Sequence, residues 1–245
     1  MRRLAFLLGA LVAALAASGC ASSPDADPRD PLEPMNRAVY KFNDGFDDYF
    51  AKPVAGAYRK LLHAEIRSRV GNFFSNLQDI MIGANNVLQG KFQEGIEDWA
   101  RFAFNSTVGL AGIHDVASEM GIEKHNEDFG QTFGRWGAGS GPYLILPILG
   151  SSSLRDGIGT VADLYAAPLP HVRPIALRNS LYGLYFLNTR SELLAASDIL
   201  EQAALDRYTF QRDAYLQRRR SLIYDGSPPR ERLEEVNDRP DPSVK

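Results

Sequence analysis

The sequence predicts a mainly α-helical fold, and two patterns support this prediction. Between residues 34 and 224, apolar side chains recur every three or four positions, which is the spacing of amphipathic helices. The long alternations of apolar and polar residues that indicate strands are missing from the same region. A stretch rich in glycine and proline, residues 129–150, interrupts the helical pattern and needs a separate interpretation.

The chain opens with the features of a lipoprotein signal. Two arginines precede an unbroken apolar run over residues 4–17, which is shorter than the roughly 20 residues that a membrane-spanning helix needs. The run leads into AASGC, which resembles a lipobox, although Ala17 stands where the lipobox usually carries leucine. We therefore expect residues 1–19 to be removed as a signal peptide and Cys20 to carry the lipid.

Cys20 is the only cysteine, so it has no disulfide partner in an oxidising compartment. The alternative is an unused thiol behind an ordinary secretory signal. Ala21 follows it, whereas an aspartate at that position commonly retains lipoproteins at the inner membrane. The expected location is the periplasmic side of the outer membrane. Residues 20–31 then form a lipidated tether, residues 32–224 a helical domain and residues 225–245 a disordered tail.

The helical periodicity divides into six segments. Pro34 suits the first turn of the first helix, which Pro53 is expected to break. Gly90 is expected to close the second helix. The predicted helices cover about residues 34–52, 66–88, 92–108, 154–165, 175–197 and 198–224.

Two segments do not read as ordinary helices. Residues 110–122 are apolar and interrupted by glycine, which indicates an interfacial or buried segment. Residues 129–150 have two interpretations: a structured loop that closes over a core, or a hairpin whose apolar strands meet lipid or a partner. The residues assigned to this hairpin are Gly137, Gly139, Gly141, Pro142, Tyr143, Leu144 and Leu146.

The composition argues against catalysis, metal binding and nucleic-acid binding. Neither a G-x-S-x-G nor an H-E-x-x-H motif occurs, so we expect no enzyme activity, no metal and no cofactor. The formal net charge is −3, and the one basic cluster, residues 218–220, is interpreted as the solvent-exposed last turn of a helix. Asparagines recur beside the helical stripes, as interhelical ties or as a polar lining: Asn36, Asn43, Asn72, Asn76, Asn85, Asn86 and Asn105.

Several blocks, in order, resemble the MlaA (VacJ) family of lipoproteins. They are DPLEPMNR at residues 30–37, YKFN at 40–43, NNVLQG at 85–90, RFAFNSTVG at 101–109, DFGQT at 128–132, GPYLILP at 141–147 and RD at 155–156. Each block alone is weak, but the ordered set spans roughly residues 30–224 and is specific.

This resemblance implies a ring of amphipathic helices lying in the membrane plane around an amphipathic channel. Phe42 and Asn43 would belong to the channel-forming body, with the glycine-rich hairpin beside it. The implied function is to remove mislocalised phospholipid from the outer leaflet and pass it to a periplasmic carrier of the MlaC type, in association with a trimeric porin. The alternative function is a structural lipoprotein that docks on a porin without transporting lipid.

Overall fold

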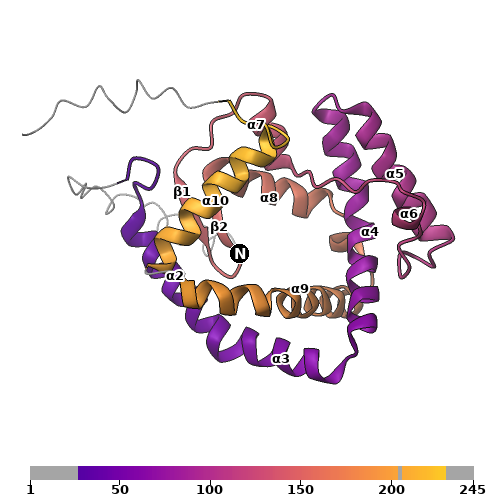
Figure 1. The fold of residues 1–245 in the computed structure, drawn as a ribbon, viewed down its shortest axis with the longest axis horizontal. Coiled ribbons are helices and arrows are strands. Elements are labelled where there is room, and N and C mark those ends of the chain that lie inside the picture. The colour runs from indigo at the N-terminus through magenta and orange to yellow at the C-terminus, as the bar shows by residue number, and fades with distance from the viewer. Residues whose placement is uncertain (1–26, 204–205, 230–245) are drawn as a thin grey trace, which may run out of the picture.

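The computed structural model describes residues 27–203 and 206–229; the predicted signal peptide, Cys20 and the tail beyond residue 229 lie outside them. The described chain is helical apart from one antiparallel hairpin, which confirms the mainly α prediction. Its helices lie around an open centre framed by α4, α8, α9 and α10 (Figure 1). The elements are α2 (Glu33–Phe46), η1 (Asp47–Ala51), α3 (Lys52–Leu61), α4 (Ala64–Leu88), α5 (Phe92–Thr107), α6 (Val116–Glu119), α7 (Phe129–Arg135), β1 (Tyr143–Leu146), β2 (Gly150–Ser153), α8 (Leu154–Ala166), η2 (Leu169–His171), α9 (Ile175–Ala203) and α10 (Arg207–Ile223).

Pro53 does not break the first helix, so that prediction is wrong. The chain passes from α2 through the π-helical turn η1 into α3, and Pro53 lies in the first turn of α3. In an α-helix the proline ring collides with the carbonyl group four residues earlier. Here the Lys52 N–H donates to the Asp47 carbonyl oxygen five residues earlier, and this wider turn accommodates the ring.

The helices α4 and α5 form an antiparallel pair, with α4 beside the open centre and α5 farther from it (Figure 1). Gly90 has φ of +84° and ends α4, as predicted, with the Lys91 N–H donating to the Asn86 carbonyl oxygen. Gly83 and Gly95 allow the two backbones to approach closely, because a Cβ added at Gly95 would lie 2.8 Å from the Gly83 carbonyl oxygen. Because one side of α4 packs against α5, another side of α4 is left facing the centre (Figure 1).

The segment 110–122 is neither wholly buried nor wholly exposed. Leu110 and Met120 are exposed, whereas Ala117 in the short helix α6 is fully buried. Asp115 begins α6 by accepting a hydrogen bond from the Ser118 N–H, and its carboxylate pairs with Arg101 of α5. The segment is therefore fixed to α5 by a polar anchor rather than by an apolar face.

The glycine-rich stretch folds into three parts, and the hairpin is narrower than predicted. Residues 129–135 form α7, residues 136–142 form a loop, and only β1 and β2 pair as strands. The loop contains Gly137, Gly139, Gly141 and Pro142, which precede the strands. Leu146 pairs with Gly150, and the second strand consists of glycine and serines, so only β1 is apolar.

The last two helices meet later than the sequence pattern predicted. Helix α9 continues to Ala203 instead of ending at residue 197. Asp206 begins α10 because its carboxylate accepts hydrogen bonds from the backbone N–H groups of Tyr208 and Thr209. The position of this capping side chain sets the start of α10, and a pattern of apolar residues does not reveal it.

Polar side chains are concentrated inside the described part of the chain, and large apolar side chains cover much of its outside. The small apolar cluster of Tyr143, Ile145 and Tyr208 joins the hairpin to α10. Across the described residues, no helix has the length and apolar character needed to cross a membrane.

Candidate functional site

The tip of the hairpin is held to α2 by one asparagine. The Asn43 Nδ2 donates to the Leu146 carbonyl oxygen at 3.0 Å, and the Ile148 N–H donates to Asn43 Oδ1 at 2.8 Å. Ile148 has φ of +67°, a conformation that is strained for a β-branched residue. Asn43 therefore holds a strained turn at the tip of the hairpin.

A second asparagine of α2 holds the base of the same hairpin. The Asn36 Nδ2 donates to Asp30 Oδ1 at 2.8 Å and to the Tyr143 carbonyl oxygen at 2.9 Å. Its Oδ1 accepts a hydrogen bond of 2.9 Å from the Ile145 N–H. Asn36 is fully buried, so each of these bonds replaces one that water would otherwise make.

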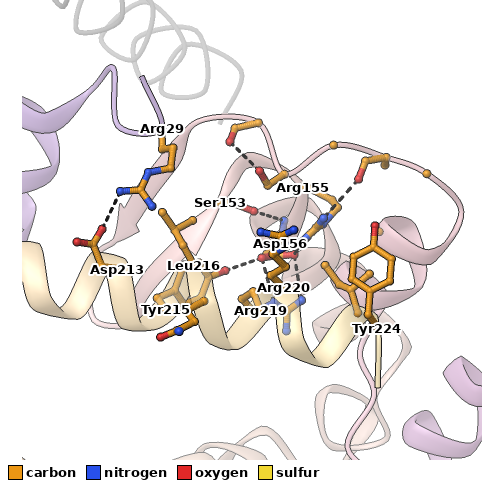
Figure 2. Close-up of a pocket in the computed structure, with 18 residues that line it drawn as sticks. Arg29, Ser153, Arg155, Asp156, Asp213, Tyr215, Leu216, Arg219, Arg220 and Tyr224 are labelled. Carbon is orange, nitrogen blue, oxygen red and sulfur yellow. Dashed lines mark hydrogen bonds and ion pairs between the residues drawn. The ribbon is translucent and has the colours of Figure 1, made fainter. Parts of the chain in front are cut away.

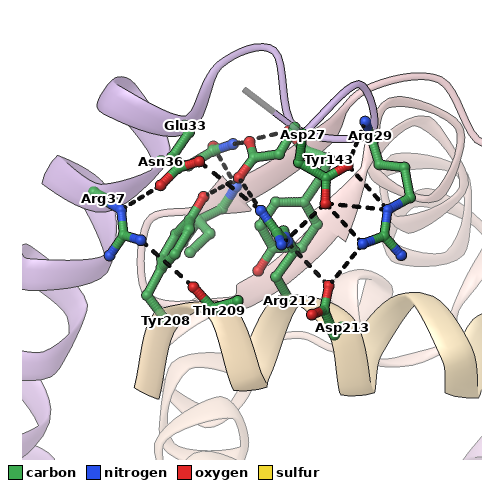
Figure 3. Close-up of polar contacts among 12 residues, drawn as sticks. Asp27, Arg29, Glu33, Asn36, Arg37, Tyr143, Tyr208, Thr209, Arg212 and Asp213 are labelled. Carbon is green, nitrogen blue, oxygen red and sulfur yellow. Dashed lines mark hydrogen bonds and ion pairs between the residues drawn. The ribbon is translucent and has the colours of Figure 1, made fainter. Parts of the chain in front are cut away.

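Asn36 belongs to a cluster that joins the start of the described chain to α10 (Figure 3). Arg212 of α10 lies 3.0 Å from Asp27 and 3.5 Å from Asp30, and the Tyr208 hydroxyl donates to Asp30. We call Asp27, Asp30, Asn36, Tyr208 and Arg212 the clasp. The clasp closes the arrangement of helices, because it joins residues 178 apart in the sequence.

The remaining asparagines singled out in the sequence also connect separate segments or brace a helix. Of the two interpretations left open, the contacts favour ties over a polar lining. The pairs are Asn72 with Ile113, Asn76 with Ser106, Asn85 with Met81 and Thr132, Asn86 with Asp98, and Asn105 with Asp115 and Ala117.

Two smaller cavities lie between elements of the described chain. The first, of about 320 Å³, lies between α4, α8, η2 and α9, and its wall is mainly apolar. The second, of about 360 Å³, lies beside the hairpin tip between α2, α9 and α10. Asn43 and Ile148 line the second cavity, and Asp163, Tyr182 and Tyr185 line the first.

Asp163 is the distinctive charged group of the first cavity. Its Oδ1 accepts a hydrogen bond of 3.2 Å from the Phe129 N–H, and no basic side chain of the described residues forms an ion pair with it. Burial, together with the nearby charge of Asp128, raises the pKa of Asp163 to about 6. The ionised carboxylate is therefore exposed to the cavity without a close counter-charge.

The other two carboxylates of this cavity are neutralised within the protein. Glu127 lies 2.9 Å from the Lys91 ammonium. Asp128 accepts two hydrogen bonds from Arg219, and although burial raises its pKa, Arg219 more than offsets that effect and leaves the pKa below its usual value. Asp163 thus differs from both neighbours because it has no ion-pair partner among the described residues.

A third and larger cavity, of about 960 Å³, lies between α10, α7 and the 137–141 loop (Figure 2). Its arginines already have partners. Arg155 pairs with Asp156 at 2.8 Å and donates to the Ala138 carbonyl oxygen, and Arg219 pairs with Asp156 at 2.9 Å. We therefore regard these charges as joining α10 to α7 and α8 rather than as an open anion site. The expectation that residues 218–220 are a solvent-exposed turn is wrong for Arg219.

The residues assigned from the sequence fall into separate places. Asn43, Leu146 and the hairpin turn come together, whereas Phe42 points outward and is 57% exposed. Gly137, Gly139 and Gly141 line the third cavity, Tyr143 is fully buried, Leu144 and Leu146 are half-buried, and Pro142 accepts a hydrogen bond from the Leu154 N–H. Cys20 lies outside the described residues.

Sequence reasoning missed the first cavity and the tip residue Ile148. One signal was available for Asp163: it is the only aspartate, glutamate, lysine or arginine between Asp156 and Arg173, in a mainly apolar stretch. Tyr182 and Tyr185 gave no comparable signal. Within the described residues, no group of histidine, cysteine, aspartate or glutamate has a metal-binding arrangement.

Comparisons with known proteins agree with these features. The family model for the MlaA lipoprotein matches residues 28–222. The intermembrane phospholipid transport system lipoprotein MlaA of Escherichia coli is 37% identical over 207 residues, covering 82% of this chain and 81% of that protein. Its counterpart in Haemophilus influenzae is 31% identical over 231 residues, covering 90% and 91% of the two chains.

One solved structure has the same arrangement. It was determined to explain the structural basis for maintenance of bacterial outer membrane lipid asymmetry, and it is 32% identical with a TM-score of 0.70. The match covers 79% of this chain and 98% of that one. The chain therefore belongs to the MlaA lipoprotein family.

Proposed function

We propose that this chain is an outer-membrane lipoprotein, anchored through Cys20, that removes mislocalised phospholipid from the outer leaflet. It passes that lipid through the open centre to a periplasmic carrier of the MlaC type and so maintains lipid asymmetry. The names of three relatives support this proposal, since they are called intermembrane phospholipid transport system lipoproteins. Because these relatives are transport proteins, the chain is not an enzyme, as the sequence indicated.

The observation that carries the proposal is the outward apolar surface of a helical arrangement with cavities inside it. Along α8, Leu154, Ile158, Val161 and Tyr165 form one helical stripe, and Tyr165 is 80% exposed. Helix α5 repeats the pattern with Phe92, Ile96 and Trp99. A soluble protein rarely exposes such continuous apolar faces, whereas helices lying within a leaflet bury them in acyl chains.

The interior suits a lipid that passes without being hydrolysed. Moving a charged headgroup through hydrocarbon costs several kcal/mol or more, so a polar route beside an apolar one lowers the barrier. The two smaller cavities combine apolar walls with a few polar groups. The hairpin tip, with Asn43 behind it, borders this route and is the element that would control passage.

The exposed tip of the hairpin also suits a membrane-embedded partner. Ile148 and Leu149 are 54% and 64% exposed and have no apolar cover in the described chain. A trimeric porin is the proposed partner for such outward apolar groups. A scaffold that only docks on a porin would use the same surface, and therefore the tests must measure lipid.

Substituting the α8 stripe is expected to weaken membrane association. In a Cys20→Ala background with the signal peptide replaced by a cleavable secretory one, Ile158→Glu combined with Val161→Glu should reduce liposome flotation at least tenfold. Burying a valine or isoleucine side chain contributes about 1.5–3 kcal/mol, and 1.4 kcal/mol is a factor of ten. The matched control is Glu94→Gln with Glu97→Gln on α5. Equal flotation of the stripe variant and its parent would contradict a membrane-buried α8.

Filling the first cavity is expected to stop lipid handling without unfolding the protein. Leu77→Trp with Leu169→Trp adds volume from α4 and from η2 to the roughly 320 Å³ space. Mass spectrometry should find stoichiometric phospholipid in the purified lipidated parent and at least a fivefold loss in the variant, with matching loss of transfer to a purified periplasmic carrier. Leu61→Trp on the exposed end of α3 is the control. Porin binding with unchanged, non-stoichiometric lipid in all three proteins would favour the scaffold.

A further inference from the structure

The first cavity contains one carboxylate whose charge the described protein does not neutralise. Glu127 has Lys91, and Asp128 has Arg219, but Asp163 has only a backbone N–H. Arg219 attracts Asp163 from farther away, yet its nitrogen atoms bind Asp128 and Asp156. A cation entering the cavity would therefore find Asp163 available.

The other walls of the cavity add aromatic surface and no positive charge. Tyr182 and Tyr185 of α9 and Phe74 of α4 line it, and its described lining contains no lysine, arginine or histidine. Aromatic faces attract ammonium groups, and a desolvated carboxylate attracts them more strongly. An anionic headgroup would meet only negative or neutral groups, which costs free energy.

We infer that Asp163 makes this cavity a subsite for a positively charged amine headgroup, so that the passage favours zwitterionic phospholipids such as phosphatidylethanolamine over anionic ones such as phosphatidylglycerol. This inference rests on the proposed transport function and adds a headgroup preference to it. The cavity, at about 320 Å³, is at the small end of ligand pockets, so it accommodates a headgroup and part of the glycerol rather than a whole lipid.

The acid–base behaviour of the cavity gives the preference a pH dependence. Around Asp163, the segment before α7 contributes Glu127 and Asp128, both paired, and α10 contributes Arg219, which is paired with Asp128 and Asp156. The lining residues of α4 and α9 carry no charge at neutral pH. Because the pKa of Asp163 is about 6, its charge is present at pH 7 and mostly lost at pH 5. The selectivity should therefore weaken as pH falls through 6.

The test uses the full lipidated protein incubated with nanodiscs containing equal amounts of the two lipids, then re-isolated for lipid mass spectrometry. At pH 7.5 the bound ratio of phosphatidylethanolamine to phosphatidylglycerol should exceed the supplied ratio about threefold to tenfold, the range for the net contribution of an ordinary hydrogen bond. Asp163→Asn should bring the ratio close to one while total bound lipid stays constant. The amide still accepts from the Phe129 N–H, so this variant should fold.

Two controls separate the possible failures. Asp48→Asn removes the same charge from an exposed position on η1 and should keep the wild-type ratio. Lowering the pH to 5 should reduce the ratio in the wild type and leave Asp163→Asn unchanged. A wild-type ratio equal to the supplied one, or an unchanged ratio in Asp163→Asn, would overturn the headgroup preference. Absence of stoichiometric lipid of either kind would instead count against the transport function itself.

Discussion

Replacing Arg219 with methionine is expected to destabilise the folded protein by about 3–5 kcal/mol, the cost of removing one partner of a buried ion pair. Arg219 extends from α10 to the carboxylate that begins α7 and to Asp156 of α8, at 2.6 Å and 2.9 Å. Its side chain is only 13% exposed. Without it, Asp128 and Asp156 would keep their burial and lose their common counter-charge.

The measurement is urea unfolding of the detergent-solubilised protein, followed by circular dichroism. Arg218→Met is the matched control, because Arg218 is the preceding residue of the same helix and its side chain is exposed. Surface changes of this kind usually alter stability by less than about 0.5 kcal/mol. Equal midpoints for the two variants would show that the Arg219 contacts do not stabilise the closure of α10 on α7 and α8.

The same ion pairs set the response of the wild type to acid. Burial raises the pKa of both Asp128 and Asp156, but Arg219 outweighs it, so both pKa values lie below their usual value. Carboxyls with a lowered folded-state pKa stabilise the protein above the unfolded-state pKa near 3.9, and the contribution is lost as pH falls through the folded value. In Arg219→Met this protection is absent, so acid unfolding should begin at a higher pH.

Asn36→Leu is expected to cost a similar amount, about 3–5 kcal/mol, for a different reason. Leucine has the same number and branching of side-chain heavy atoms but leaves the Ile145 N–H, the Tyr143 carbonyl and Asp30 each without the bond that Asn36 supplied. A buried polar group left unsatisfied costs about 1–3 kcal/mol. The loss falls on the clasp, so the hairpin and the first residues of α2 should open before the rest.

Hydrogen exchange and urea unfolding measure this effect together. Exchange should increase first at the amides of β1 in Asn36→Leu, with α4 and α5 remaining protected. Asn179→Leu, at an exposed position of α9, is the control and should match the wild type. If Asn36→Leu kept both its unfolding midpoint and the protection of the Ile145 amide, the clasp would have no energetic importance.

Periodicity and capping were sufficient to predict most helices, and the physical reason is local. The boundary of α4 follows from Gly90, whose positive φ needs no distant contact. Pro53 shows the limit of local rules, because a π turn just before it removes the clash that was expected to end the helix. The boundary between α9 and α10 depends on one capping aspartate, Asp206, which an apolar pattern cannot show.

The site was harder to predict because its parts come from distant segments. Asn43 was singled out, but its role in holding Leu146 and Ile148 depends on a contact across more than 100 residues. Arg219 was assigned to solvent because its partners, Asp128 and Asp156, are 91 and 63 residues away. Spacing along a single helix carries no information about such pairs.

The clasp also limits where the helices can sit relative to the anchor. Asp27 is fixed against Arg212, and only seven residue steps separate it from Cys20. A fully extended chain spans at most about 3.5 Å per residue, so a lipid on Cys20 would insert within about 25 Å of that contact. The peptide between the lipid and the clasp is then a short connection that keeps this part of the protein close to the membrane. On the proposed anchoring, a tilt that lifts the α2–α10 edge away from the leaflet would be limited by this length.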